Sequence, residues 1–221
     1  MADLIDATRQ YIRPRPLEEL FRISTPLPLV GKLAINEDDL LFAPLGGSAE
    51  RDWTLPGWLE AARLALDAIP GRLILIGNDT PRHREFNGHL ANLAASDRLV
   101  DLTAQTGLTD LLHVAARCGG YLGTNTAPMH LVAIQGKKLV ALNSPFESAD
   151  FWQYPFENQV LVAGRRLLRG GQQPDISHCI DKIRQRRRSP DANDGLYPAA
   201  DVAGAICTVF ARQIATQRQA S

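Results

Sequence analysis

A run of small and polar residues from Gly123 to His130 carries the clearest chemical signal in the sequence. A short apolar strand is expected to end at Gly123, and Pro128 suits the first turn of a following helix. The backbone amides from Asn125 to Met129 would then point out of the helix N-terminus, where the dipole favours a phosphate, with His130 within reach of the same anion. A capped helix with a packed histidine explains only part of this string. The candidate anion-binding residues are Asn125, Thr126, Ala127, Pro128, Met129 and His130.

A second candidate loop runs from Gly46 to Trp53 and combines two glycines, a hydroxyl and a cation. Glycine lets backbone amides approach an anion closely, Ser48 offers a hydroxyl, and the Arg51 guanidinium can bind two phosphate oxygens at once. A surface turn with a solvated arginine explains the same residues equally well. From this loop, Gly47, Ser48 and Arg51 are candidate phosphate ligands.

Two further loops carry weaker signals. Asp79 follows the most apolar strand, and an acidic residue at a strand end can hold a ribose diol. Capping of the next helix by Asp79 or Thr80 is the more economical interpretation of the local sequence. Thr106 and Gly107 would flank a flat base, because glycine leaves room for it, and Thr109 is a possible cap of the helix that follows.

The elements that must position these loops alternate along the chain. Short apolar runs followed by amphipathic helices predict βαβ units and an α/β fold with a doubly wound parallel sheet. In such a sheet, ligands bind outside the carboxyl ends of the strands, where the candidate loops lie. The predicted strands are residues 40–44, 72–77, 99–102, 120–123, 138–142 and 159–162. The predicted helices are residues 55–69, 82–95, 108–117, 127–135, 176–188 and 199–214, with a short helix possible at 2–12.

A change in composition near residue 39 predicts two parts of the chain. Residues 1–38 are proline-rich, with Pro14, Pro16, Pro26 and Pro28 breaking regular structure, and are typical of a linker or a strap over a neighbouring surface. Residues 39–221 are expected to form a single Rossmann-like domain that ends in C-terminal helices.

Composition and charge narrow the protein class. The sequence is 45% hydrophobic and 22% charged, which is globular composition, and its 24 basic residues balance 24 acidic ones, so a nucleic-acid partner is not expected. Three scattered cysteines suit neither a disulfide framework nor a zinc site, so no metal is expected. With no secretory signal and no apolar run long enough to cross a bilayer, we expect a soluble cytoplasmic protein.

Four segments together resemble the C-terminal half of the ADP-heptose–lipopolysaccharide heptosyltransferases, glycosyltransferase family 9. Asp101 to Leu108 reads DLTAQTGL where family members typically show DLTGQTSL, and Gly123 to Leu131 corresponds to GNDSGPMHL. Leu139 to Pro145 corresponds to VALFGP, and the Gly46–Trp53 loop carries Arg51 near the position of a basic residue that is usually lysine. The resemblance covers about residues 39 to 215.

The resemblance implies a GT-B enzyme whose C-terminal Rossmann-like domain holds the nucleotide sugar. The donor would be an ADP-activated heptose or similar sugar, bound as a substrate with no tightly bound cofactor. An acceptor hydroxyl of a lipopolysaccharide core or related glycan would displace the diphosphate in one inverting step, with Arg51 stabilising the leaving group. The general base would come from an acceptor domain that this sequence lacks, supplied by a separate protein.

Two departures from the family pattern leave a second function open. Asn125 stands where the family usually has Asp, and Ala127 where it has Gly. With the missing acceptor domain, these changes are compatible with a non-catalytic half-domain that acts as a binding or scaffold partner. A nucleotide-sugar epimerase of GT-B fold is a weaker third possibility.

A run of arginines near the C-terminus raises the question of whether the protein contacts a membrane surface. It is expected to be solvated at the end of a helix, with peripheral contact to anionic lipid at the inner face of the cytoplasmic membrane as the alternative. The expected partners are therefore a nucleotide sugar, a glycan or lipid-linked acceptor and an acceptor-domain protein. The arginines of this run are Arg184, Arg186, Arg187 and Arg188.

Overall fold

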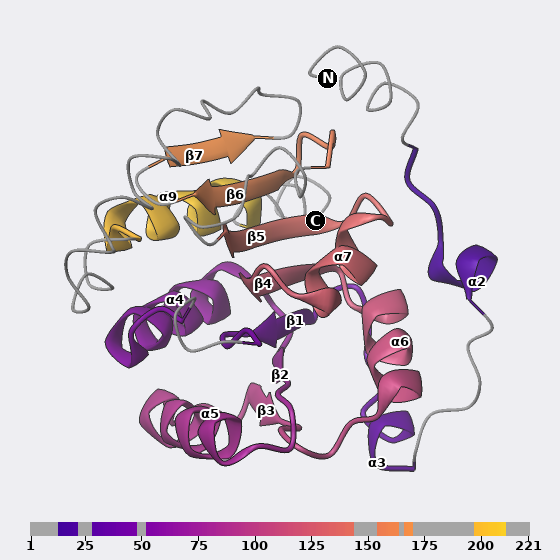
Figure 1. Ribbon diagram of the computed structural model, residues 1–221, viewed down its shortest axis with the longest axis horizontal. Helices are drawn as coiled ribbons and strands as arrows, with labels where there is room; N and C mark the ends of the chain where they lie inside the picture. The colour runs from indigo at the N-terminus through magenta and orange to yellow at the C-terminus, as the bar shows by residue number, and fades with distance from the viewer. Residues whose placement is uncertain are drawn as a thin grey trace.

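The computed structural model describes residues 13–21, 28–47, 52–143, 154–163, 166–169 and 197–210. Its centre is a seven-stranded sheet in the order β3-β2-β1-β4-β5-β6-β7 (Figure 1). The pairs from β3 to β6 are parallel, and β6 pairs with β7 antiparallel. The strands are β1 (Leu40–Ala43), β2 (Leu73–Leu75), β3 (Leu99–Asp101), β4 (Gly120–Thr124), β5 (Lys138–Asn143), β6 (Gln159–Ala163) and β7 (Arg166–Arg169).

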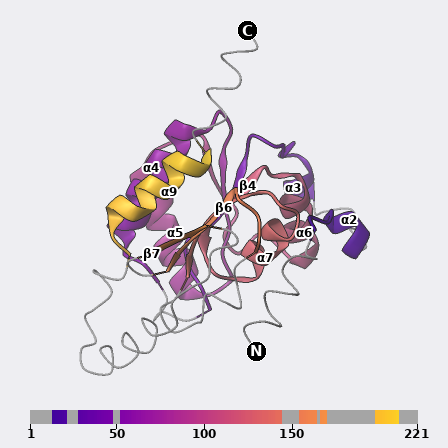
Figure 2. The same ribbon diagram turned by 90° about the horizontal axis from the view of Figure 1, so that it is seen from above.

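Helices cover both faces of this sheet. Helices α4, α5 and α9 lie on one face, and α2, α3, α6 and α7 lie on the other, as the two perpendicular views show (Figures 1 and 2). The bounds of the helices are α2 (Leu17–Leu20), α3 (Pro28–Gly31), α4 (Leu55–Ala68), α5 (Pro81–Ala94), α6 (Leu108–Arg117), α7 (Ala127–Ala133) and α9 (Ala199–Phe210). The predicted doubly wound α/β fold is confirmed.

The strands are apolar throughout because both faces are buried. In β1, Leu40 and Phe42 pack into the core under α4 and α9, whereas Leu41 and Ala43 pack into the core under α6 and α7. All four residues are buried, since successive side chains of a strand point to opposite faces. Two separate cores therefore hold the sheet between its helix layers.

The described part of the proline-rich segment packs on the α6–α7 face. Leu17 and Val30 have no exposed surface and belong to the same core as α6 and α7. The buried carboxylate of Asp39 accepts two hydrogen bonds from the Arg72 side chain, which also donates to the carbonyl of Leu33 at 2.8 Å. These contacts tie the segment to the amino-terminal end of the sheet. The predicted division at residue 39 stays a prediction.

Most predicted elements agree with the structure. The helix predicted at residues 108–117 has these bounds in α6, and the six predicted strands appear with small shifts at their ends. The antiparallel strand β7 was not predicted. The helices predicted at residues 2–12 and 176–188, and the arginine run at 184–188, lie outside the described residues. In the described part of the chain, no helix has the length and apolar character needed to span a membrane.

Candidate functional site

A cavity of about 420 Å³ lies at the carboxyl edge of the sheet. It sits where the strand order reverses, because β1 has β2 on one side and β4 on the other. Ligands of open parallel sheets bind at such a switch point, and the volume falls in the range of small-molecule sites. All four candidate loops contribute to its lining: Gly46 and Gly47 after β1, Gly77 and Asn78 after β2, Thr106 to Leu108 after β3, and Asn125 to Pro128 after β4.

The end of β4, just before the loop, has a position that only glycine can occupy. Gly123 has a φ of 156°, and a Cβ there would lie 2.3 Å from the carbonyl oxygen of Ala43. The buried hydroxyl of Tyr121 donates to the carbonyl of Thr124 at 2.6 Å and fixes the turn from the other side. Burial raises the pKa of Tyr121, so the hydroxyl stays protonated as a donor.

The amides of this loop offer less to an anion than the sequence suggested. The N–H of Asn125 donates to the carbonyl of Leu142 at 2.9 Å, and the N–H of Met129 donates to the carbonyl of Thr126 at 2.9 Å. Pro128 has no N–H, so at most the amides of Thr126 and Ala127 can face a ligand. The expectation of a row of free amides from Asn125 to Met129 is wrong.

Two of the predicted residues in this loop lie away from the cavity. Met129 is fully buried in the core of the α6–α7 face, and neither Met129 nor His130 is among the residues that line the cavity. His130 Nδ1 lies 3.3 Å from the hydroxyl of Tyr154, whose ring stacks on Phe156. Burial lowers the pKa of His130, which favours a neutral imidazole. A role of either residue in ligand binding stays a prediction.

Asn125 lines the cavity but is tied into the protein. It is 7% exposed, and its Nδ2 donates to Oδ1 of Asn143 at 2.7 Å. The backbone carbonyl of Asn143 accepts a hydrogen bond from the hydroxyl of Tyr197 at 3.0 Å, which links the loop to the segment before α9. Asn125 is therefore buried at this edge of the sheet, and its side chain joins the loop after β4 to β5.

The loop after β1 is held by a cation that the sequence did not single out. Arg82, in the first turn of α5, donates to the carbonyl of Gly46 and to Oδ2 of Asp52 at 2.5 Å. Asp52 in turn accepts from the N–H of Gly46 at 3.3 Å. Burial raises the pKa of Asp52, and Arg82 and the Gly46 amide oppose the rise. Ser48 and Arg51 lie outside the described residues, so their contacts to phosphate stay predictions.

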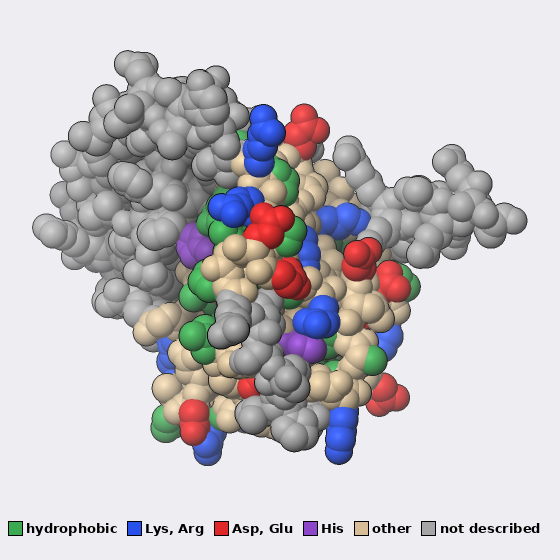
Figure 3. All heavy atoms as spheres, turned by 90° about the vertical axis from the view of Figure 1, so that its right-hand side faces the viewer, with side chains coloured by type: hydrophobic (Ala, Val, Ile, Leu, Met, Phe, Trp, Pro, Cys, Tyr) green, Lys and Arg blue, Asp and Glu red, His purple; other side chains and the backbone are tan. Residues whose placement is uncertain are grey.

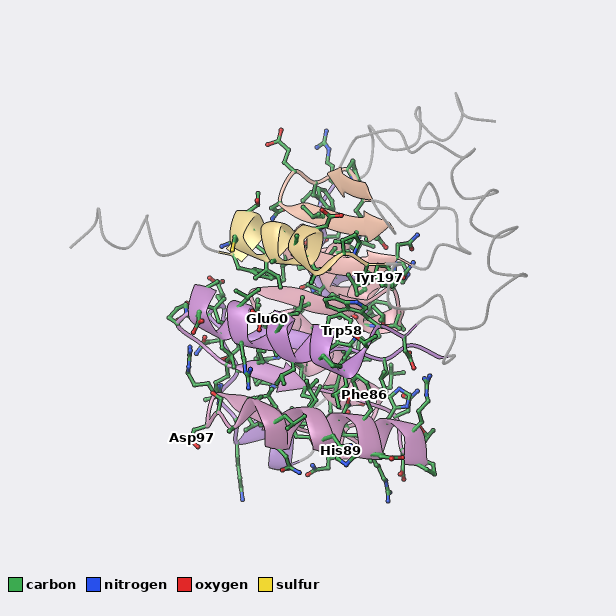
Figure 4. The ribbon with its side chains drawn as sticks, turned by 90° about the vertical axis from the view of Figure 1, so that its left-hand side faces the viewer. Trp58, Glu60, Phe86, His89, Asp97 and Tyr197 are labelled. Carbon is green, nitrogen blue, oxygen red and sulfur yellow. The ribbon has the colours of Figure 1, made fainter. Side chains whose placement is uncertain are left out.

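Aromatic packing supports the start of α4 beside this loop. Trp53 makes edge contacts with Trp58 at 5.3 Å and with Tyr197 at 6.4 Å between ring centroids. Figure 4 shows Trp58 on α4 and Tyr197, before α9, at the same end of these helices. The loop between β1 and α4 is therefore held at its end by the ring contacts of Trp53.

The residues of the loop after β2 have different roles. Thr80 caps α5, since its hydroxyl accepts from the N–H of His83 at 3.3 Å. Asp79 is 65% exposed, pairs with Arg84 and is not among the cavity-lining residues. The cavity is lined instead by Gly77 and Asn78. The capping interpretation is confirmed for Thr80, and the contact of Asp79 to a ribose stays a prediction.

His83 lines the cavity, and sequence reasoning did not select it. The side chain is 5% exposed, and its Nδ1 lies 2.8 Å from the hydroxyl of Thr80. Desolvation and, second, the nearby charge of Arg82 lower the pKa of His83. The sequence held a usable signal, because a side chain in the first turn of a helix that follows a strand lies at the ligand-binding edge.

The loop after β3 is closed by a hydrogen bond from the N-cap amide of α6 to a carboxylate in its first turn. Gly107 is the N-cap of α6, and its N–H donates to the carboxylate of Asp110 at 2.9 Å. Thr109 lies inside the helix, so the prediction that it caps α6 is wrong. Leu108, 72% exposed, forms an apolar rim to the cavity beside Thr106.

The described surface beside α2 and α6 carries no patch of one charge, because acidic and basic side chains are interspersed on it (Figure 3). Of the residues that both line the cavity and are described, none is lysine or arginine. Within the same described residues, no group of three or more His, Cys, Asp and Glu side chains is arranged to hold a metal ion.

Comparison with solved structures relates this fold to glycosyltransferases. The chain is similar to the Escherichia coli ADP-heptose LPS heptosyltransferase II, with 17% identity and a TM-score of 0.53 over 81% of this chain and 48% of that chain. It is also similar to the glycosyl transferase family 9 structure from Veillonella parvula DSM 2008, with 14% identity and a TM-score of 0.57 over 94% and 52% of the two chains. The chain therefore spans about half the length of these proteins.

These likenesses define the fold class. No protein-family model and no curated protein sequence matches the chain. The architecture resembles a GT-B glycosyltransferase half-domain, and the resemblance that the sequence predicted is confirmed at the level of the fold.

Proposed function

We propose that the cavity binds a nucleotide sugar and that the chain is the donor-binding part of a glycosyltransferase. The observation that carries the proposal is the convergence of four separately predicted loops on one cavity at the switch point of the sheet. The likeness to two glycosyltransferases supports the same class. An ADP-activated heptose or similar sugar is the donor that the sequence resemblance implies.

Each part of the donor lies against one loop. The base lies beside Thr106 and Gly107, and the diphosphate lies between the Gly46–Gly47 loop and the amides of Thr126 and Ala127. Arg51 supplies the cation that the diphosphate needs. The ribose then lies near Gly77 and Asn78, between base and diphosphate.

The proposed reaction is a single inverting displacement. The oxygen of an acceptor hydroxyl forms a bond to the anomeric carbon of the sugar, and the bond from that carbon to the diphosphate oxygen breaks. The nucleoside diphosphate leaves with the electron pair, and the hydroxyl proton passes to a base supplied by an acceptor-binding domain. Arg51 stabilises the charge that develops on the leaving group.

Calorimetric titration with ADP tests the proposal. We expect saturable binding to the parent chain and a large loss of affinity in Ala127→Phe. Ala127 lines the cavity, and the phenyl ring that replaces its methyl group would occupy space that the ligand needs. Ala199→Phe is the matched control, since Ala199 is also the exposed first residue of a helix but not among the cavity-lining residues. No binding at millimolar ADP, or equal binding by both variants, contradicts the proposal.

A non-catalytic binding partner is the second candidate. It is favoured by the absence of lysine and arginine from the described lining and by the commitment of Asn125 to Asn143. Incubating the chain with a nucleotide sugar and a glycan acceptor, first without and then with an acceptor-domain protein, separates the two. Transfer by the chain without a partner excludes the scaffold function.

A further inference from the structure

His83 is the ionisable side chain among the described residues that line the cavity. Its ring lies beside Gly77, since a Cβ built on Gly77 would lie 3.1 Å from His83 Cδ2. Cδ2 is bonded to Nε2, so the edge of the ring that carries Nε2 lies next to a residue of the cavity wall. Among the described residues, no hydrogen bond occupies Nε2.

The other ring nitrogen has a partner that selects the tautomer. Thr80 Oγ1 accepts the backbone N–H of His83 at 3.3 Å and lies 2.8 Å from Nδ1. A hydroxyl that already accepts a hydrogen bond is best satisfied by donating its own proton, and a neutral Nδ1 is an acceptor. Nδ1 is then unprotonated, and the proton of the imidazole lies on Nε2.

Two effects keep this imidazole neutral. His83 is the third residue of α5, where the positive end of the helix dipole disfavours a cation. Burial and the charge of Arg82, the charged group near the ring, both lower the pKa of His83. A neutral ring in this tautomer carries an N–H donor at Nε2 rather than a charge or a base.

We propose that His83 is a specificity-determining residue that donates a hydrogen bond from Nε2 to an oxygen of the bound nucleotide, and that Thr80 is the positioning residue that fixes the tautomer. This inference rests on the proposed function of the cavity. The oxygen belongs to the ribose or to a phosphate, and both present the same acceptor chemistry. A ligand without an oxygen at this point would leave the buried N–H unpaired, which is how a hydrogen-bonding site rejects an analogue.

Titration of three chains with ADP and with adenosine tests the donor. We expect His83→Leu, which keeps an apolar volume but has no donor, to bind about tenfold more weakly than the parent, while His83→Gln, which keeps an N–H donor at a similar reach, loses about threefold or less. A loss with both ligands assigns the ribose, and a loss with ADP only assigns a phosphate. Equal binding by the parent and His83→Leu, or equal losses in the two variants, overturns the inference. A parent that binds neither ligand overturns the proposed function.

Imidazole nitrogen NMR of the parent tests the tautomer without depending on the folding of a variant. We expect the shifts of a neutral ring protonated at Nε2 in the parent and in Thr80→Ser, which keeps the hydroxyl. In Thr80→Val, the ring should change to a mixture of tautomers, and the variant should bind ADP more weakly. The midpoint of unfolding, recorded for the same variant, separates this effect from the loss of stability caused by removing the helix cap. A parent ring protonated at Nδ1, or no change in Thr80→Val, overturns the role of Thr80.

Discussion

A methyl group at Gly77 should reveal how tightly the loop after β2 is built. In Gly77→Ala, the new Cβ would lie 2.6 Å from Nδ2 of Asn87, about 0.8 Å short of the 3.4 Å at which ordinary contact begins. Asn87 is fully buried and donates to the carbonyl of Ile76 at 3.2 Å and to Oγ1 of Thr103 at 2.8 Å. The amide therefore cannot move away without losing hydrogen bonds.

The expected cost combines overpacking with a weakened hydrogen bond. Overpacking a buried site costs about 1–3 kcal/mol, and one weakened buried hydrogen bond adds about 1 kcal/mol, so we expect the free energy of unfolding to fall by about 2–4 kcal/mol. For a chain of this length, the melting temperature should fall by about 4–16 °C. Urea denaturation and thermal unfolding followed by circular dichroism measure both quantities.

Gly88→Ala is the matched control, on the helix that carries Asn87. Gly88 lies inside α5, and a Cβ there would meet nothing within 4 Å. Alanine in a helix interior is preferred to glycine, so this variant should gain up to about 1 kcal/mol. A Gly77→Ala variant that unfolds at the temperature of the parent, or a shift of both variants in the same direction, would refute the reasoning.

Three further predictions concern charge. Arg51→Ala should weaken ADP binding by about 1.5–3 kcal/mol in calorimetry, and unchanged affinity would remove Arg51 from the phosphate site. Asn125→Asp should lower the free energy of unfolding, measured in urea, by about 1–3 kcal/mol at pH 7.5, because a buried carboxylate would face Oδ1 of Asn143. Burial raises the pKa of the new acid, so the loss of stability should shrink toward pH 5, where the protonated acid can donate a hydrogen bond to this oxygen. Burial of Asp39 opposes ionisation, but hydrogen bonds from Arg72 and backbone amides outweigh it and lower the pKa of the carboxyl. Asp39→Asn should therefore melt below the parent at pH 7, and the gap should close as the pH falls through the folded pKa of Asp39.

Local sequence signals determined most of the fold. The bounds of α6 follow from features within a few residues of each other, namely the glycine N-cap with Asp110 and the buried apolar residues Leu112 and Ala115, which are three positions apart and so share one face of the helix. The strands were found because short apolar runs are what a parallel sheet buried on both faces requires. The positions of the candidate loops followed at once, since each loop begins where such a run ends.

Tertiary structure decided which residues of those loops meet. Met129 and His130 follow Asn125 within five residues, yet Met129 points into the core because the 3.6-residue period of α7 turns it from the edge. Arg82 reaches Gly46 only because α5 returns beside the β1 loop, a contact across 36 positions in the chain. No local pattern encodes that pairing.

The order of the strands in the sheet was also decided by the tertiary structure. Strand β4 lies beside β1 rather than β3, and this choice creates the switch point where the cavity opens. The partner of a strand is selected by packing across the whole sheet, which no local sequence pattern encodes. The sequence by itself therefore determined the strands and their loops. Only the tertiary structure decided that four loops share one cavity and that His83 lines it.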